Sequence, residues 1–197
     1  MQNKKYTFSY LVQQSVLLFR MRYLHILPSF CRRVWYRFLG MKIGKGTQLP
    51  GIFITWPHQV SFGEKCVLEH HINFKFDGIW KKEASIIIGD EVFIGAGCEF
   101  NISGGIRIGK KTMIASGCKF IDHDHGTSIH EAMNAQQPLI APIEIGEEVW
   151  LGVNVVVLRG VKIGKGAVIA AGSVLLKDVG EYEIHGGVPA KFLKKRS

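Results

Sequence analysis

IEIGEEVWLGVNVVVLRGVKIGKGAVIAAGSVLLKD, residues 143–178, carries a large aliphatic residue at every sixth position. Six positions follow this spacing: Ile145, Leu151, Val157, Ile163, Ile169 and Leu175. A helical face recurs about every 3.6 residues and a strand face about every 2, so neither element explains a period of six. The sustained six-residue period predicts a solenoid of very short strands with a turn between each pair.

A second set of positions, four residues after the large aliphatics, takes small or β-branched residues. These positions hold Val149, Val155, Val161, Ala167 and Ser173. One large and one small side chain in each repeat predict a narrow interior filled by stacked layers. Gly146, Gly152 and Gly164 follow the large residue, where we expect the chain to bend and to use the φ freedom of glycine.

The repeat resembles that of the hexapeptide-repeat acyltransferases: a large aliphatic residue, a glycine, two free positions, a small residue and one more. In that family three hexads form one triangular coil of a left-handed parallel β-helix. The resemblance covers residues 40–196 and is nearest to sugar acetyltransferases of the capsule, exopolysaccharide, maltose and galactoside types. It implies an all-β fold of this kind with a short C-terminal extension. The residues before it add an N-terminal helical segment, which is expected from their own composition and not from the resemblance. The periodicity itself predicts the solenoid but not its hand.

The repeat is interrupted at several places along the chain. It begins at Ile43, lapses over residues 73–84, and slips by two residues at residues 103–105. The largest interruption is residues 121–142, IDHDHGTSIHEAMNAQQPLIAP, after which the repeat resumes in a new phase, so a loop must leave the solenoid there. We therefore expect a basic, aromatic helical segment at residues 1–39 and a hexapeptide-repeat domain at residues 40–197, with an active-site loop at residues 121–142.

Charge and cysteine usage restrict the partners and the compartment. The formal net charge of +9 favours anionic partners such as phosphorylated cofactors, acidic glycans, nucleic acid or membrane surfaces. Cys66, Cys98 and Cys118 fall in the small-residue position of the hexad, and the sequence has no C-x-x-C pair. We expect them to be reduced thiols buried in the core of a cytoplasmic protein.

Residues 1–39 are apolar and basic and lack the hexad. The charge-free run at residues 6–19 is shorter than the about 20 residues of a membrane span, and no A-x-A site marks a signal peptide. We expect a helix that caps the open end of the solenoid; the alternative is a peripheral contact with the inner face of the membrane. No base-reading motif accompanies the basic residues, so no nucleic-acid partner is expected.

The run DHDHG, residues 122–126, contains the candidates for catalysis. In the resembling acetyltransferases a loop at this point carries a histidine that acts as the general base, and His123 matches it. That base removes the proton from a sugar hydroxyl as the oxygen attacks the thioester of acetyl-CoA. The resemblance places Asn101, Asp122 and His125 at the substrate. Asp122 or Asp124 would orient the ring, and His125 is the alternative base.

The resemblance also implies where acetyl-CoA, the acyl donor, binds. Seven residues are expected at this cofactor: Gly152, Val153, Ala171, Leu176, Lys177, Lys191 and Lys194. The first two would line the pantetheine channel. The last two belong to the closing segment, residues 186–196, where basic side chains would meet the phosphates of CoA.

We therefore expect an acetyl-CoA-dependent O-acetyltransferase acting on a sugar hydroxyl, of a surface glycan or its precursor. The resemblance implies a homotrimer in which His123 meets CoA bound along a neighbouring chain. Three alternatives stay open: an N-acetyltransferase of an amino sugar, a zinc enzyme similar to the γ-class carbonic anhydrases, and a non-catalytic scaffold. Zinc ligands would come from His70, His71, His123, His125 and His130. These lack the clean spacing of that family, so no metal is expected.

Overall fold

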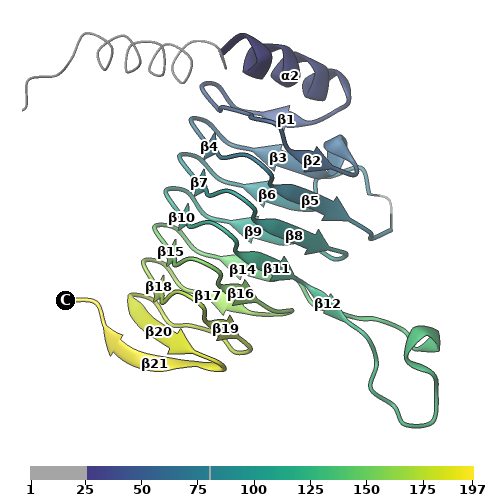
Figure 1. Ribbon diagram of the computed structural model, residues 1–197, viewed down its shortest axis with the longest axis vertical. Coiled ribbons are helices and arrows are strands. Elements are labelled where there is room, and N and C mark those ends of the chain that lie inside the picture. Colours follow the sequence, from purple (N-terminus) through teal and green to yellow (C-terminus); the bar gives the residue numbers. More distant parts are fainter. Residues whose placement is uncertain (1–25, 80) are drawn as a thin grey trace, which may run out of the picture.

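The chain winds into a three-sided coil in the computed structural model, which describes residues 26–79 and 81–197 (Figure 1). Each turn of the coil adds one short parallel strand to each of three sheets, named here A, B and C in the order in which the chain visits them. Sheet A contains β1 (Lys42–Ile43), β3 (Val60–Phe62), β6 (Ile86–Ile88), β9 (Ile106–Ile108), β14 (Ile143–Ile145) and β17 (Lys162–Ile163). Sheet B contains β4 (Val67–Leu68), β7 (Phe93–Ile94), β10 (Met113–Ile114), β15 (Trp150–Leu151), β18 (Val168–Ile169), β20 (Glu183–Gly187) and β21 (Ala190–Lys195). Sheet C contains β2 (Phe53–Ile54), β5 (Asn73–Phe76), β8 (Glu99–Ile102), β11 (Lys119–Ile121), β16 (Val156–Val157) and β19 (Val174–Leu175).

The pairing of the strands confirms the predicted register. The six large aliphatic positions of residues 143–178 pair two by two between successive coils, and all six are buried. The pairs are Ile145 with Ile163, Leu151 with Ile169, and Val157 with Leu175. Cys66, Cys98 and Cys118 are free and buried, as predicted, and burial raises the pKa of the Cys66 thiol.

The glycines of the hexad serve a different purpose from the one predicted. Gly146, Gly152 and Gly164 are not among the residues with positive φ; in the corner that holds Gly146, Glu148 takes that conformation instead, with φ at 57°. A Cβ on Gly164 would lie 2.5 Å from the backbone nitrogen of Glu181 in the next coil, closer than atoms can approach. The stacked corners therefore require glycine because the backbones lie so close together, not because the chain bends there.

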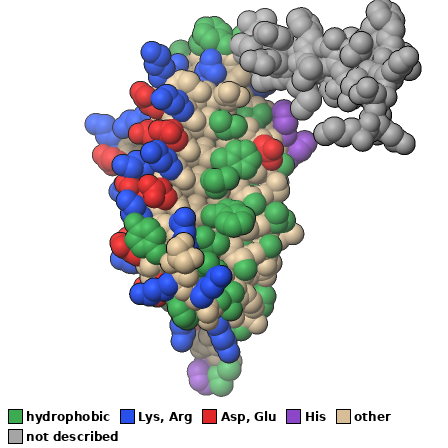
Figure 2. Space-filling view, turned by 90° about the vertical axis from the view of Figure 1, so that its left-hand side faces the viewer, with side chains coloured by type: hydrophobic (Ala, Val, Ile, Leu, Met, Phe, Trp, Pro, Cys, Tyr) green, Lys and Arg blue, Asp and Glu red, His purple; other side chains and the backbone are tan. Residues whose placement is uncertain are grey.

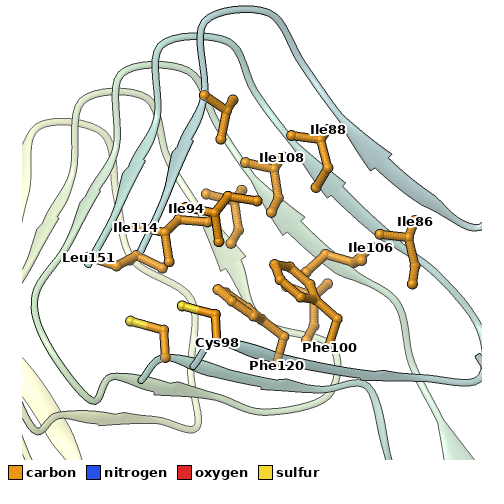
Figure 3. Packing of buried hydrophobic residues seen from close by; sticks show 14 of the residues in the cluster. Ile86, Ile88, Ile94, Cys98, Phe100, Ile106, Ile108, Ile114, Phe120 and Leu151 are labelled. Atoms are coloured by element: carbon orange, nitrogen blue, oxygen red, sulfur yellow. The ribbon is translucent and has the colours of Figure 1, made fainter. Parts of the chain in front are cut away.

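Aromatic rings fill the interior beside sheet C. The rings of Phe74, Phe100 and Phe120 stack with neighbouring centroids 4.6 Å apart and planes 17° apart; Figure 3 labels the last two. Phe74 belongs to β5, which lies inside the stretch where a lapse was predicted. That prediction is wrong for residues 73–76, because the six-residue spacing continues from Phe62 through Leu68 to Phe74. The described residues outside the strands there are 77–79 and 81–85, between β5 and β6.

Helix α2 (Ile26–Phe38) lies across the first coil (Figure 1). Three arginines donate to main-chain oxygens of that coil: Arg32 to Leu49 at 2.9 Å, Arg33 to Thr47 at 3.1 Å, and Arg37 to Ile43 at 2.7 Å. Ser29 is buried, and its Oγ accepts a bond from the Leu49 N–H at 3.1 Å. The rest of the expected N-terminal helix, residues 1–25, lies outside the described residues. Among the described helices, none has the length and apolar character needed to cross a bilayer.

One segment leaves the coil at the corner between sheets C and A, and we call residues 122–142 the arm (Figure 1). β12 (His123–Asp124) and β13 (Leu139–Ile140) pair antiparallel at its base, and a 3-10 turn, η2 (Met133–Ala135), lies further out; a similar turn, η1 (Pro57–Gln59), precedes β3. The buried side chain of Gln136 donates to the carbonyl oxygens of Ser128 and Glu131 at 2.9 and 3.0 Å. The arm therefore has internal structure where the sequence predicted only a loop.

Candidate active site

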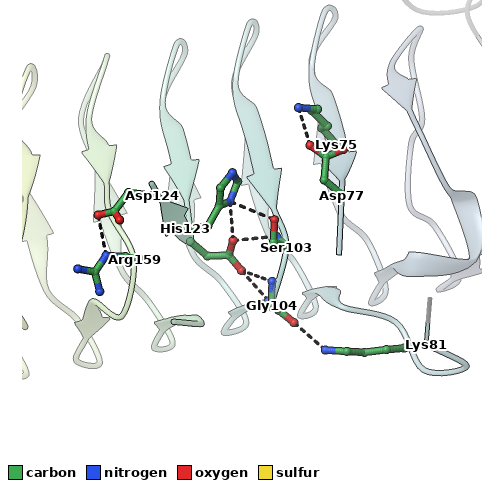
Figure 4. A network of polar contacts seen from close by, with 10 residues as sticks. Lys75, Asp77, Lys81, Ser103, Gly104, His123, Asp124 and Arg159 are labelled. Carbon is green, nitrogen blue, oxygen red and sulfur yellow. Dashed lines mark hydrogen bonds and ion pairs between the residues drawn. The ribbon is translucent and has the colours of Figure 1, made fainter. Parts of the chain in front are cut away.

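The carboxylate of Asp122 organises the corner from which the arm leaves, and Figure 4 labels three of its partners, Ser103, Gly104 and His123. Its side chain is fully buried, and it accepts three backbone N–H bonds from the turn of the preceding coil. The donors are Ser103 at 2.8 Å, Gly104 at 2.7 Å and Gly105 at 2.7 Å. These are the residues at which the hexad slips, so the slip exposes three N–H groups that Asp122 then satisfies.

His123 lies against this carboxylate. Its Nδ1 is 3.1 Å from Asp122 Oδ1 and 3.2 Å from Ser103 Oγ, and its side chain is 20% exposed. An ionised carboxylate only accepts hydrogen bonds, so Nδ1 of the neutral ring must carry the proton. Nε2 then holds the lone pair and can accept a proton. Of the two aspartates predicted to orient the ring, Asp122 does so.

The second aspartate of the run has another function. Asp124 Oδ2 lies 2.7 Å from Arg159 Nε, in the turn after β16, and this ion pair joins the base of the arm to the next coil (Figure 4). The backbone adds two bonds there: Ala141 N–H to the Asp122 oxygen and Gly160 N–H to the Ala141 oxygen, both at 2.9 Å. These contacts fix the arm where it carries His123. His125, the alternative base, is exposed further along the arm.

Asn101 points outward from sheet C. It pairs in register with Ile121, and Ile121 lies two residues before His123 in the chain. Its Oδ1 is buried and has no hydrogen-bond partner among the described residues. An unpaired buried acceptor is unfavourable by about 1–3 kcal/mol, so it marks a place where a ligand hydroxyl can donate. Lys75, opposite Asn101 in β5, is paired with Asp77 at 2.6 Å.

Sequence reasoning missed Ser103, Lys75 and Arg159 at this corner. The slip of the hexad at residues 103–105 was a visible signal for Ser103, because a break in the repeat frees backbone and side-chain groups. Lys75 and Arg159 carry no such signal, since their proximity depends on which coil stacks on which.

The structure places the seven predicted cofactor residues in three regions of the single chain. Gly152, Val153 and Ala171 lie at the corner between sheets B and C, where the Gly172 N–H donates to the Val153 oxygen at 2.8 Å. Leu176 and Lys177 follow β19, at the corner between sheets C and A, which is also where the arm begins. Both lysines of the closing segment, Lys191 and Lys194, lie on β21. One copy of the chain does not bring the whole set together.

The histidines considered for zinc are also separated. His70 and His71 lie in the turn between β4 and β5, at the corner of sheets B and C, whereas His123 is at the corner of sheets C and A. In the part of the chain that the structure describes, no three His, Cys, Asp or Glu side chains are grouped so that they could hold a metal ion.

The outer face of sheet B carries an apolar column, one side chain from each successive strand. Its members are Val67, Phe93, Met113, Trp150, Val168 and Ile184. Trp150 is 52% exposed, and Figure 2 shows hydrophobic side chains running down this face of the molecule beside a charged border. A hollow of about 440 Å³ lies beside Trp150, with Lys111 and Arg196 in its wall. Such an exposed apolar surface is typical of a protein interface.

Comparison with known proteins agrees with this architecture. Residues 142–177 match the family described as bacterial transferase hexapeptide (six repeats), and residues 85–118 match the hexapeptide repeat of succinyl-transferase. A Mycobacterium tuberculosis protein named as an acetyltransferase is 32% identical over 197 residues, which cover 98% of this chain and 60% of that protein. An Escherichia coli protein, WbbJ, named for lipopolysaccharide biosynthesis as an O-acetyl transferase, is 40% identical over 99 residues, covering 46% of this chain and 50% of that protein. The chain thus spans between half and 60% of the length of these two relatives.

A solved structure shares the fold. AntD, an N-acyltransferase from Bacillus cereus in complex with dTDP and 3-hydroxybutyryl-CoA, superposes with a TM-score of 0.73 at 18% identity, covering 84% of this chain and 88% of that one. Six-residue repeats, three parallel sheets and one interrupting arm define a hexapeptide-repeat solenoid. Residues 85–118 and 142–177 carry the repeats of hexapeptide transferases, and the fold is the left-handed parallel β-helix predicted from the sequence.

Proposed function

We propose that this protein transfers the acetyl group of acetyl-CoA to a sugar hydroxyl, with His123 as the general base. The observation that carries the proposal is the Nδ1 contact with Asp122, which leaves Nε2 as the proton acceptor. Nε2 removes the hydroxyl proton as the oxygen attacks the thioester carbon. The C–S bond then breaks, and the proton passes from the imidazolium to the departing sulfur of CoA. The carboxylate of Asp122 stabilises the imidazolium between the two steps.

The names of the relatives support this reaction class. The mycobacterial relative is named as an acetyltransferase, and WbbJ is named for O-acetyl transfer in lipopolysaccharide biosynthesis. The second name favours oxygen over nitrogen as the accepting atom, and a surface glycan or its precursor as the substrate. AntD, which shares the fold, was crystallised with an acyl-CoA and a nucleotide.

Asn101 is the proposed contact to the acceptor sugar. Its buried Oδ1 lacks a partner, and it lies on the strand next to the one that leads into His123. A sugar hydroxyl that donates to this oxygen would relieve the unfavourable burial and hold the acceptor beside the base. His125 and Asp122 were expected at the substrate as well; Asp122 is fully buried and acts through His123 as a positioning residue.

We place the acetyl-CoA site between two copies of a homotrimer. In a cyclic trimer each contact joins two different sides of the chain, so residues from separate corners can meet across one interface. This arrangement accounts for the separation of Gly152, Val153 and Ala171 from Leu176 and Lys177 in a single copy. The apolar column of sheet B provides the surface for such a contact, and Ile129 and Met133, exposed on the arm, suit a contact with a neighbouring copy.

The test is a screen of sugars with the purified protein and acetyl-CoA, with release of the free CoA thiol as the readout. A product that loses its acetyl group to hydroxylamine is an ester and supports transfer to oxygen. A product that resists hydroxylamine is an amide, and the amino-sugar alternative would then replace this proposal. Thiol release that does not depend on any sugar would contradict both.

A further inference from the structure

Helix α2 has two different faces. Ser29 and the three arginines of α2 turn inward to the first coil, where each has a main-chain partner. The outward face is apolar: Phe38 is 81% exposed, Trp35 58% and Phe30 53%. The rings of Trp35 and Phe38 stack with centroids 6.0 Å apart. We call Phe30, Val34, Trp35 and Phe38 the aromatic face.

The excess of positive charge lies in the first third of the sequence. Residues 1–63 contain nine Lys and Arg and no Asp or Glu, whereas residues 64–197 contain 16 of each kind. The whole formal charge of +9 therefore belongs to the first third of the sequence. Lys42 and Lys45, on the first coil below α2, are exposed. The coil below them is electrically balanced.

We propose that the aromatic face of α2 docks this protein onto the surface of a membrane that contains anionic lipids. Trp and Phe side chains are favoured at the boundary between head groups and acyl chains, and nearby Lys and Arg are attracted by anionic head groups. The blunt end of the coil, where α2 lies, would face the membrane (Figure 1). On the sequence alone, capping of the coil and membrane contact are alternatives. In this proposal the inward face of α2 caps the coil and its outward face contacts the membrane. The proposal does not depend on the proposed reaction.

Two other occupants fit the observations less well. A second copy docked on the same face would bring together two positively charged ends, because residues 26–63 contain five Lys and Arg and no Asp or Glu to pair with them. Nucleic acid would need outward cations on the helix, but Arg32 and Arg37 donate inward to the coil. The experiment below distinguishes a second copy and nucleic acid from a membrane.

The test uses the full chain and sedimented vesicles of phosphatidylcholine, alone or with about 30% phosphatidylserine. We expect binding to the anionic vesicles, weaker binding at high salt, and little binding to phosphatidylcholine alone. The double substitution Trp35→Ser and Phe38→Ser should weaken binding to the anionic vesicles by about ten-fold or more. The matched control is Phe53→Ser, which removes an equally exposed aromatic ring from β2 and should leave binding unchanged.

A second measurement locates the contact. Brominated lipid should quench part of the tryptophan fluorescence of the bound parent protein, and Trp35→Phe should remove that quenching while keeping the binding. The proposal is overturned if the double variant binds the anionic vesicles as the parent does, because another segment then makes the contact. It is also overturned if the parent binds no vesicles. In that case, a change in oligomeric mass in the double variant would point to a second copy on the aromatic face, and a change in affinity for nucleic acid would point to nucleic acid there.

Discussion

One carboxylate, that of Asp122, connects the folding of the corner to the chemistry proposed there. It accepts three backbone N–H groups from residues 103–105, and it also contacts Nδ1 of His123. The turn and the tautomer of the histidine are therefore set by the same buried group. A change in His123 should affect the reaction alone, whereas a change in Asp122 should affect both the reaction and the stability of the corner.

His123→Ala should lower turnover by about 10²–10⁴-fold, the usual contribution of a general base, with little change in affinity for CoA. Steady-state kinetics and calorimetric titration with CoA measure the two effects. We expect them to separate because none of the seven predicted cofactor residues belongs to the arm.

The control is His125→Ala, two residues away on the same arm and exposed. It should leave turnover near that of the parent. If His125→Ala proved the more damaging substitution, the base would have to be reassigned.

Lys191→Ala and Lys194→Ala should have the reverse effect. Both lysines lie exposed on β21, and contacts with the phosphates of CoA would stabilise ground state and transition state alike. We expect a higher KM for acetyl-CoA with a smaller change in kcat. An unchanged KM in both variants would show that the phosphates bind elsewhere.

At this scale the sequence predicted where the arm that carries His123 leaves the coil, because the arm breaks a strict repeat. It could not choose between Asp122 and Asp124 as the partner of the ring. That choice depends on the turn at residues 103–105, one coil away, whose N–H groups face Asp122. Contacts between stacked coils leave no local pattern in the sequence.

Among the structural elements, β17 tests the register of the whole ladder. Ile163 is buried and pairs with Ile145, so Ile163→Asp should bury an unpaired charge and lower the free energy of unfolding by more than about 3 kcal/mol. For a chain of this size that corresponds to a fall in Tm of at least about 6 °C. Its neighbour Lys162 points outward, and Lys162→Ala should change stability by less than about 1 kcal/mol. If Ile163→Asp and the parent had the same Tm, the assignment of Ile163 to the interior of the coil would be wrong.

The hairpin of β20 and β21 should respond to acid. His185 Nε2 lies 2.9 Å from Glu183 Oε2, and this contact, with the Gly180 N–H, lowers the pKa of the Glu183 carboxyl. A carboxyl whose pKa is lower in the folded state stabilises the fold above its unfolded value, about 4.3, and loses this effect as the pH falls through the folded value. Thermal melts between about pH 7 and pH 3 should therefore show a smaller acid loss for Glu183→Gln than for the parent. Parallel curves would contradict this role.

The sequence predicted the elements well where one rule determines them. Every sixth residue is buried because each coil repeats the last, and no knowledge of distant contacts is needed. The purpose of the hexad glycines was mistaken, because the distance from Gly164 to Glu181 depends on how two corners stack. The side-chain bonds that order the outer part of the arm were also not visible, since they are made by a single buried amide, Gln136.

At the scale of the whole molecule, the apolar column of sheet B should join the copies of the proposed trimer. Trp150→Glu should place a charge in that interface, so light scattering should find one copy of 22.0 kDa where the parent gives three times that mass. If acetyl-CoA binds between two copies, the monomeric variant should also lose acetyl-transfer activity. Ile79→Glu, in the segment between β5 and β6 and outside sheet B, changes a side chain that is 86% exposed and should leave the mass unchanged. A monomeric parent with full activity would contradict the trimer.

The two ends of the coil have one more consequence. A stack of parallel strands with a bare end can accept the strands of another molecule at a spacing of about 4.8 Å, and the addition can repeat without limit. Here α2 occupies one end, where its arginines already bind the main-chain oxygens of Ile43, Thr47 and Leu49. At the other end β21 runs antiparallel to β20 and interrupts the parallel order of sheet B. These two closures make the protein a particle of finite length, whereas the same repeat without them could grow into a filament.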